Sequence, residues 1–275
     1  MRTPFLCIAK HPRYDAVMHT WQQRLAGRRA RRPEFHPQAP LHVDDALRAP
    51  LARSLARFQL GESGDGEHLL SAAERLGDGD RVELLRAFLA EEQDHARWLG
   101  RAVDALGGRR LTRHWSASAF RVVRRLGGVD LELMVLMVAE LLGATYYRAL
   151  ARHVDDPQLR ALLGQIARDE GVHIALHVDW QRRYLHVMGP LRRALFRCGF
   201  HAFYRAVSVL VLLDHRAVLR RCGGLRAFWR ASGDLLRRVT AAQFRPCGLS
   251  GRSLARIRHV RSDGAVDASR RPAAV

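Results

Sequence analysis

The sequence predicts an all-α protein that is built on a four-helix bundle and continues into additional C-terminal helices. Three observations support this fold class. Between residues 44 and 186, apolar residues recur at the spacing of amphipathic helices. Strand signals, meaning alternating runs rich in β-branched residues, are nearly absent from the same region. The loops between the four predicted helices are short, long and short, which is typical of two antiparallel hairpins joined by one long crossover.

The first predicted hairpin consists of a helix from about Pro50 to Leu76 and a second helix after the loop GDGD. Proline suits the first turn of a helix, because a backbone N–H has no intrahelical partner there. Asp80 is expected to cap the second helix, and the pair Gly107 and Gly108 is expected to end it. The core-facing stripes of the two helices are Leu55, Phe58, Glu62, Gly66, Leu69 and Ala73, followed by Leu85, Phe88, Glu92, His95, Leu99, Ala102 and Leu106.

The second predicted hairpin follows a long connection at residues 109–128. Asp156 and Pro157 are expected to form the cap and the first turn of the fourth helix. The core-facing stripes of the third and fourth helices are Leu133, Leu136, Glu140, Ala144, Tyr147 and Ala151, followed by Leu162, Ile166, Glu170, His173, His177 and Tyr184.

Composition divides the chain into four segments. Residues 1–43 are expected to be an irregular basic segment, and they carry eight basic and two acidic side chains. Residues 44–190 are expected to form the bundle, and residues 191–249 are expected to form additional basic helices that pack on it. Residues 250–275 are expected to be a disordered basic tail. The net charge of +19 therefore comes from the flanks and not from the predicted bundle.

Each of the four core-facing stripes contains an acid where an apolar residue belongs. A buried carboxylate is costly unless it is paired or bound to a cation, and the arginines of this region fall on other helix faces. The pattern of Glu, a 30-residue interval and then Glu-x-x-His occurs twice, as Glu62, Glu92 and His95 and as Glu140, Glu170 and His173.

The spacing of these residues has a direct chemical meaning. On a helix, residues i and i+3 lie about 60° apart and about 4.5 Å along the axis, so a Glu and a His can reach one ion. Four carboxylates neutralise two divalent cations, and mixed oxygen and nitrogen donors suit iron or manganese. The pattern therefore predicts a dinuclear metal site at these six residues, with a coincidental polar core as the alternative.

Other residues near the ligands are candidates for supporting roles. Asp169 and Glu91 each stand directly before a ligand glutamate, about 100° from the ligand face. An acid at that angle can accept a hydrogen bond from the distal nitrogen of a ligand histidine, and the alternative is a solvated surface acid. His177 is interpreted as a core histidine, with a third ligand or a proton donor as alternatives. Tyr146 and Tyr147 are interpreted as packing residues, with pocket lining or electron transfer as alternatives.

With these motifs, residues 44–186 resemble the ferritin-like diiron-carboxylate superfamily. FQLGES around Glu62 is similar to the first-helix signature of rubrerythrins, and EEQDH and DEGVH are similar to the paired motifs of acyl-carrier-protein desaturases. The resemblance implies that the six residues bind two iron ions and form the catalytic centre, with a manganese–iron pair as the alternative. The chain has no rubredoxin domain and no additional ligand glutamate near Glu140. Ile166 and Phe88 stand where the N-oxygenase subgroup has a histidine, so that subgroup is not favoured.

The resemblance also implies an activity. The expected function is a non-haem diiron oxidase or oxygenase that activates dioxygen and hydroxylates, desaturates or cleaves a small organic or carrier-bound substrate. Electrons would come from a separate reductase or ferredoxin, because the chain shows no nucleotide-binding motif. The first alternative is an iron-binding or peroxide-scavenging protein of the rubrerythrin or ferritin type. The second is a non-enzymatic protein that uses its basic helices on a membrane or an acidic partner.

Other features of the composition limit the partners. Lys10 is the only lysine, a skew attributed to genomic base composition, and without a recognition motif nucleic acid is not an expected partner. The four cysteines form no C-x-x-C pair, so a disulfide framework is not expected. The apolar runs at 4–9 and 206–213 are too short for a signal peptide and a membrane span. A cytoplasmic protein is therefore expected, and a homodimer is one open alternative for its oligomeric state.

Overall fold

The chain is helical in the computed structural model, as the sequence predicts. The structure describes residues 12–35, 40–64, 66–75, 79–116, 118, 120, 122 and 128–245. Helices and connecting loops account for all of these residues. The helices are α2 (Pro12–Arg29), α3 (Asp45–Glu62), α4 (Glu67–Arg75), α5 (Gly79–Ala105), α7 (Gly128–Ala151), α8 (Pro157–Val187), α9 (Pro190–Asp214), α10 (Arg216–Leu219) and α11 (Leu225–Gln243).

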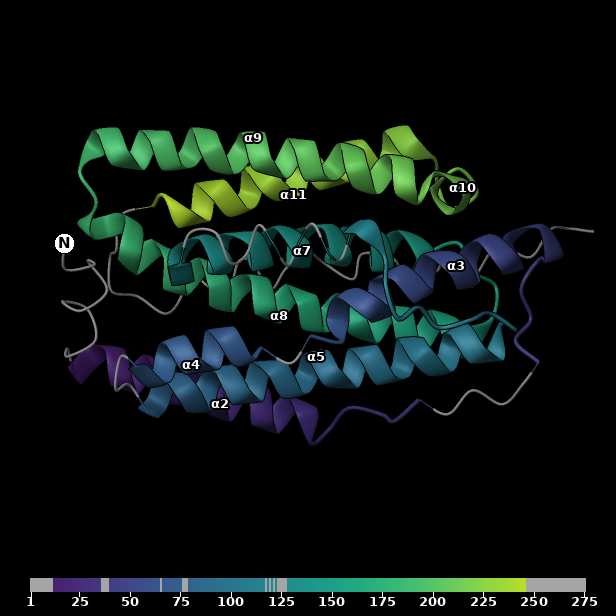
Figure 1. Cartoon of the computed structure of the whole chain (residues 1–275), viewed down its shortest axis with the longest axis horizontal. Coiled ribbons are helices and arrows are strands. Elements are labelled where there is room, and N and C mark those ends of the chain that lie inside the picture. Colours follow the sequence, from purple (N-terminus) through teal and green to yellow (C-terminus); the bar gives the residue numbers. More distant parts are fainter. Residues whose placement is uncertain are drawn as a thin grey trace, which may run out of the picture.

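The long helices lie side by side in layers (Figure 1). Helices α9 and α11 form one edge of the molecule, and α2 and α4 lie at the opposite edge. Between them, α7 packs along α8 and α3 packs along α5. Helix α5 also contacts α8, which brings the two pairs together in the middle of the molecule.

The single first helix predicted from the sequence is wrong, because the structure has two helices, α3 and α4, in its place. Helix α3 begins earlier than predicted, since the Asp44 side chain caps it and Pro50 lies inside it. The chain breaks before α4 at Gly66, whose φ is 66°. A Cβ at this glycine would approach the Leu89 side chain to 2.4 Å, so a close helix contact requires glycine here.

The other predicted helix ends agree more closely with the structure. Asp80 lies within the first turn of α5 and not at its cap, because the helix already begins at Gly79. Gly107, with a φ of 73°, follows the end of α5 as predicted. Asp156 caps α8 by accepting a hydrogen bond from the Leu159 backbone N–H at 2.8 Å, and proline follows it.

The prediction that residues 1–43 are irregular is wrong for helix α2. Trp21 and Leu25 of α2 are buried, and they pack in an apolar cluster with Leu85 and Phe88 of α5. The arginine-rich composition concealed this helix, because among its residues of described burial two buried apolar side chains, four residues apart, mark its inner face.

The additional C-terminal helices predicted at 191–249 are α9, α10 and α11. By length and composition, two helical segments of the described part of the chain are apolar enough to cross a membrane, Glu132–Ala151 and Pro190–Asp214. This is weak evidence for a span, and 72% of the first segment is buried in the core, whereas only 17% of the second is buried. The predicted tail at 250–275 and the side chain of Tyr184 lie outside the described residues.

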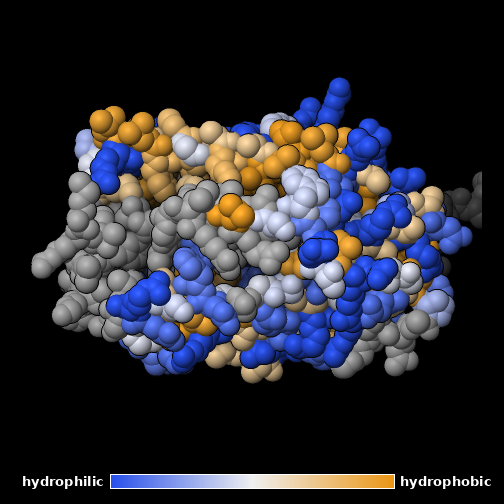
Figure 2. All heavy atoms as spheres, in the orientation of Figure 1, coloured by the Kyte–Doolittle hydropathy of each residue, from blue (hydrophilic) through white to orange (hydrophobic). Residues whose placement is uncertain are grey.

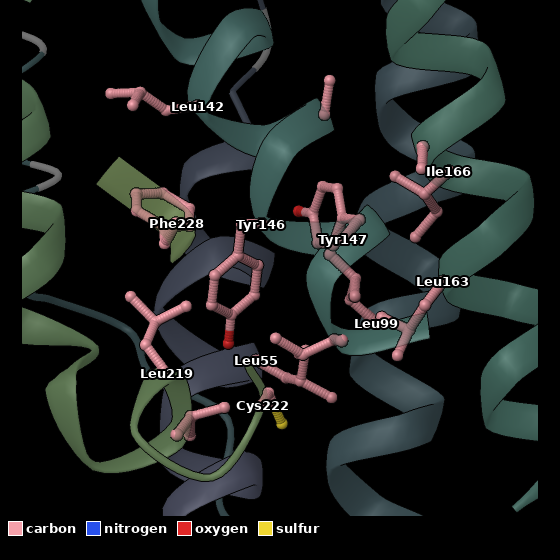
Figure 3. Close-up of a cluster of buried hydrophobic side chains, with 14 of the residues drawn as sticks. Leu55, Leu99, Leu142, Tyr146, Tyr147, Leu163, Ile166, Leu219, Cys222 and Phe228 are labelled. Carbon is pink, nitrogen blue, oxygen red and sulfur yellow. The ribbon is translucent and has the colours of Figure 1, made fainter. Parts of the chain in front are cut away.

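The core consists of two apolar clusters with a polar belt between them. In α5, Leu85 and Phe88 belong to one cluster, and Leu99 and Val103 belong to the other. Four polar residues of α5 lie between these two sets and form its part of the polar belt: Glu91, Glu92, Asp94 and His95. Figure 3 shows part of the larger cluster, in which leucines of several helices surround Tyr146 and Tyr147.

Candidate metal centre

The polar belt brings together the six residues that the sequence pattern selects. One glutamate is the last residue of α3, and each of the other three helices contributes from within its length. Glu62 is half-buried and the other five residues are buried. The contributions are Glu62 from α3, Glu92 and His95 from α5, Glu140 from α7, and Glu170 and His173 from α8.

These residues form two overlapping groups, each able to hold a metal ion. Within a group, one ligand atom of each residue lies within 4.8 Å of those of the other members. Glu92 and Glu170 belong to both groups. The groups are Glu62, Glu92, His95 and Glu170, and Glu92, Glu140, Glu170 and His173.

Both histidines turn the same ring nitrogen, Nδ1, toward the carboxylates. His95 Nδ1 lies 3.4 Å from Glu170 Oε1, and His173 Nδ1 lies 3.1 Å from Glu92 Oε1. Two of these buried atoms, His95 Nδ1 and Glu92 Oε1, have no hydrogen-bond partner among the described residues. Buried polar atoms of a folded protein are normally satisfied, so this pair indicates that a ligand belongs between them.

The Nε2 atoms of the two histidine rings contact Asp169 and Glu91. These acids directly precede Glu170 and Glu92 in the sequence. His95 Nε2 of α5 lies 3.4 Å from Asp169 Oδ2 of α8. In the reverse direction, His173 Nε2 of α8 lies 2.9 Å from Glu91 Oε2 of α5. Each helix therefore supplies the acid that orients the histidine of the other. Such a contact leaves Nδ1 free to bind a cation and makes it a stronger ligand.

Helix α2 and the turn that follows it add a layer of arginines behind these acids. Arg32 Nη1 donates to Asp169 at 2.9 Å, and Arg28 Nη2 donates to the same carboxylate at 2.8 Å. Arg32 also donates to Asp94 at 2.8 Å, and its side chain is only 4% exposed. None of the ion pairs among the described residues joins an arginine to one of the six cluster residues. The arginines therefore fix the supporting acids and leave the cluster acids without a cation of their own.

The carboxylates of the cluster differ in their proton affinity. Burial raises the pKa of Glu62 and of Glu140, and the neighbouring carboxylates raise both further. Burial also acts against the charge of Glu170, but hydrogen bonds from Glu140, His173 and His95 outweigh it and lower its pKa.

The histidines hold protons in the absence of a metal. Burial alone lowers the pKa of His95, but the hydrogen bond to Asp169 and the nearby Glu170 carboxylate outweigh burial and raise it to about 10. The pKa of His173 is raised in the same way by the surrounding glutamates. Protons therefore balance the clustered carboxylates, and a cation that binds here has to displace them.

The two neighbouring tyrosines of α7 form separate buried hydrogen bonds, one to the cluster and one to a network beside it. Tyr147 OH donates to Glu62 Oε1 at 2.8 Å. Tyr146 contacts Ser54, and Ser54 Oγ lies 2.6 Å from His215 Nδ1. Both tyrosines, Ser54 and His215 are buried. The sequence analysis assigned both tyrosines to packing, and it missed these hydrogen bonds because Ser54 and His215 are distant in sequence.

His177 is buried beside the cluster but belongs to neither group of metal ligands. Its ring contacts Phe88 edge-on, with the ring centroids 5.7 Å apart. Burial lowers the pKa of His177 to about 3, and nearby His173 lowers it further, so the ring is neutral. Its Nε2 atom has no hydrogen-bond partner among the described residues, so the sequence-based interpretation as a satisfied core histidine stays untested.

Sequence reasoning also missed the arginines of the second layer, Arg28 and Arg32. Their signal in the sequence is a spacing of four, three and four residues from Trp21 through Leu25 and Arg28 to Arg32. Comparison of the chain with known protein families, curated proteins and solved structures finds no match. The geometry of the site is therefore the basis for assigning a function.

Proposed function

We propose that this protein is a non-haem diiron oxidase or oxygenase on a ferritin-like four-helix bundle of α3, α5, α7 and α8. The observation that best supports this proposal is that the two four-residue groups share Glu92 and Glu170. A single cation site needs one such group, whereas two groups that share a pair of carboxylates suit two neighbouring ions. The expected reactions are hydroxylation, desaturation or oxidative cleavage of an organic substrate.

The donor set fits two iron ions. Glu62 and His95 would hold one ion, and Glu140 and His173 would hold the other. Glu92 and Glu170, which belong to both groups, would contribute to holding both ions. Four carboxylates balance two divalent charges, and their mixture with imidazole nitrogens suits iron, with a manganese–iron pair as the variant.

Two irons at this position supply the electrons and open coordination sites that dioxygen activation requires. The residues of the chain provide the surroundings. Tyr147 holds the Glu62 carboxylate through its hydroxyl, and the apolar side chains on both sides of the belt exclude water. His177 offers a neutral ring with an unpartnered nitrogen one helical turn from His173. A separate electron-donor protein would reduce the centre.

The test is anaerobic titration of the metal-free protein with Fe(II), followed by exposure to oxygen. We expect about two irons per chain and a near-ultraviolet absorption that appears only with oxygen. A matched control is Glu67→Gln, which removes an exposed acid of α4 and should leave both readouts unchanged. Binding of fewer than about two irons, or no optical response to oxygen, would contradict the proposal.

A further inference from the structure

Helix α9 exposes more large apolar side chains than any other described element. Among the described residues, the exposed large hydrophobics outside α9 are Trp115 and Val122. Five others lie on this single helix, with exposed fractions between 44% and 72%: Leu191, Leu195, Val209, Leu210 and Leu213. A contiguous exposed apolar surface on a folded protein commonly marks an interaction site.

The exposed side chains form a stripe along the helix and not a scatter. At about 100° per residue, four of them lie within about 40° of one line, and two exposed alanines fill the gap between them. These six residues, named here the α9 stripe, are Leu191, Leu195, Ala202, Ala206, Val209 and Leu213. Figure 2 shows apolar side chains gathered along the edge of the molecule where α9 lies.

The opposite face of α9 is fixed to the protein. Phe200 and Tyr204 are fully buried against the core, and Tyr204 OH donates to the Ser232 carbonyl of α11 at 3.1 Å. The α9 stripe therefore faces away from the body of the protein. A helix of 25 residues is about 37 Å long, so the stripe runs along most of one edge of the molecule.

The surroundings of the α9 stripe are strongly basic. Residues 190–245 contain twelve arginines and two acids. Both acids are already paired, Asp214 with Arg57 at 2.9 Å and Asp234 with Arg237. Exposed arginines lie on α9, on α11 and between them: Arg192, Arg197, Arg216, Arg220, Arg221, Arg226, Arg230, Arg237 and Arg238.

This charge decides among the occupants that could cover the stripe. A second copy of the chain would bring a second set of arginines against the first. Residues 246–275 carry six basic and two acidic side chains, so the chain's own C-terminal segment is also repelled. A bilayer with anionic headgroups matches both properties of this surface. Its apolar interior can cover the exposed leucines, and its negative charge attracts the surrounding arginines.

We infer that the α9 stripe attaches the protein to the surface of membranes that contain anionic lipids. The stripe enters the boundary between headgroups and acyl chains, while the surrounding arginines pair with lipid phosphates. The helix lies in the plane of the membrane, because its inner face stays packed on α11 and on the core. This inference does not depend on the metal centre, and it adds a location that the proposed oxidase function leaves open.

The test is co-sedimentation of the full-length protein with vesicles of phosphatidylcholine alone or with one third phosphatidylglycerol. We expect binding to the anionic vesicles that weakens at high salt. The variant Leu195→Gln/Val209→Gln/Leu213→Gln, which changes three residues of the α9 stripe, should bind at least about tenfold more weakly. All three side chains are exposed, so the variant should fold, which circular dichroism can verify. The matched control is Val122→Gln, an equally exposed apolar residue outside α9.

Three outcomes would overturn the inference. One is wild-type protein that does not sediment with anionic vesicles, or a triple variant that sediments as well as wild type. Another is a dimer in analytical ultracentrifugation that the triple variant abolishes without any vesicle binding, which would assign the stripe to a second copy. The third is vesicle association that resists alkaline carbonate, which would indicate insertion of α9 across the bilayer.

Discussion

In a folded protein, charged side chains are usually exposed and large apolar side chains are usually buried. The polar belt and the α9 stripe depart from this distribution in opposite ways. The belt contains three buried glutamates, the half-buried Glu62 and two buried histidines, whereas α9 exposes a row of leucines and a valine. Burial of unpaired carboxylates and exposure of apolar rows are both unfavourable in an isolated protein in water. We propose that each region is completed by something outside the chain, a small cation in the belt and a membrane surface along the α9 stripe.

The largest expected effect is a loss of iron from the polar belt that leaves membrane binding by the α9 stripe unchanged. Glu170→Gln removes a carboxylate that belongs to both metal groups, so we predict loss of both irons. Glu140→Gln removes a residue of one group only and should lose about one iron. Iron analysis after gel filtration measures both, and vesicle binding should be unchanged in both variants.

The fold of these variants serves as the control. Hydrogen bonds from Glu140, His173 and His95 stabilise the Glu170 charge, so the metal-free Glu170→Gln protein should unfold at a lower temperature than the wild type. Circular dichroism at the assay temperature checks that the variant is still folded. A variant that retains both irons would contradict the assignment of Glu170 as a shared ligand.

A smaller effect is expected from the acids behind the histidines. Asp169→Asn removes the partner of His95 and of two arginines, and we predict about 10- to 100-fold weaker iron binding at unchanged stoichiometry. The matched control is Asp104→Asn, which breaks an exposed pair with Arg110. Competition with a chelator measures the affinity. Equal affinity in both variants would assign Asp169 to the stability of the fold alone.

The pH dependence of stability should distinguish the metal-free protein from the metal-loaded one. The folded pKa of His95 is about 10, above the unfolded value of 6.5. Its contribution is therefore fully present below about pH 6.5 and is lost as the pH rises toward 10. The raised pKa values of Glu62 and Glu140 act in the same direction.

We therefore predict that the free energy of unfolding of the metal-free protein falls by on the order of a few kcal/mol over this range. Urea unfolding at several pH values measures it. In the metal-loaded protein the cation replaces the protons, so the decrease should be smaller. Identical pH profiles with and without iron would show that the metal binds elsewhere.

The smallest effect is expected at the edge of the belt. Tyr147→Phe removes one hydrogen bond to Glu62 and leaves all ligands in place. A neutral hydrogen bond contributes about 1 kcal/mol, so iron affinity should fall about fivefold at unchanged stoichiometry. Tyr204→Phe, which removes a similar buried hydroxyl far from the cluster, is the control. A loss of iron in the Tyr147 variant would make this tyrosine part of the metal site itself.

The sequence by itself determined the helical class and the six residues of the cluster. Both follow from local spacing, since the i+3 pair and the 30-residue interval place a carboxylate on each apolar stripe. The Asp156 cap and the glycine end of α5 follow from local backbone chemistry in the same way.

Only the tertiary structure decided which residues surround the cluster. Arg28 and Arg32 meet Asp169 across more than a hundred residues of sequence, and no local pattern encodes such a contact. The same holds for the break before α4, where Gly66 adopts a φ of 66° and lies close to the Leu89 side chain of α5. It also holds for α9, since its composition shows that it is apolar, but packing decides which face is buried and which stays exposed.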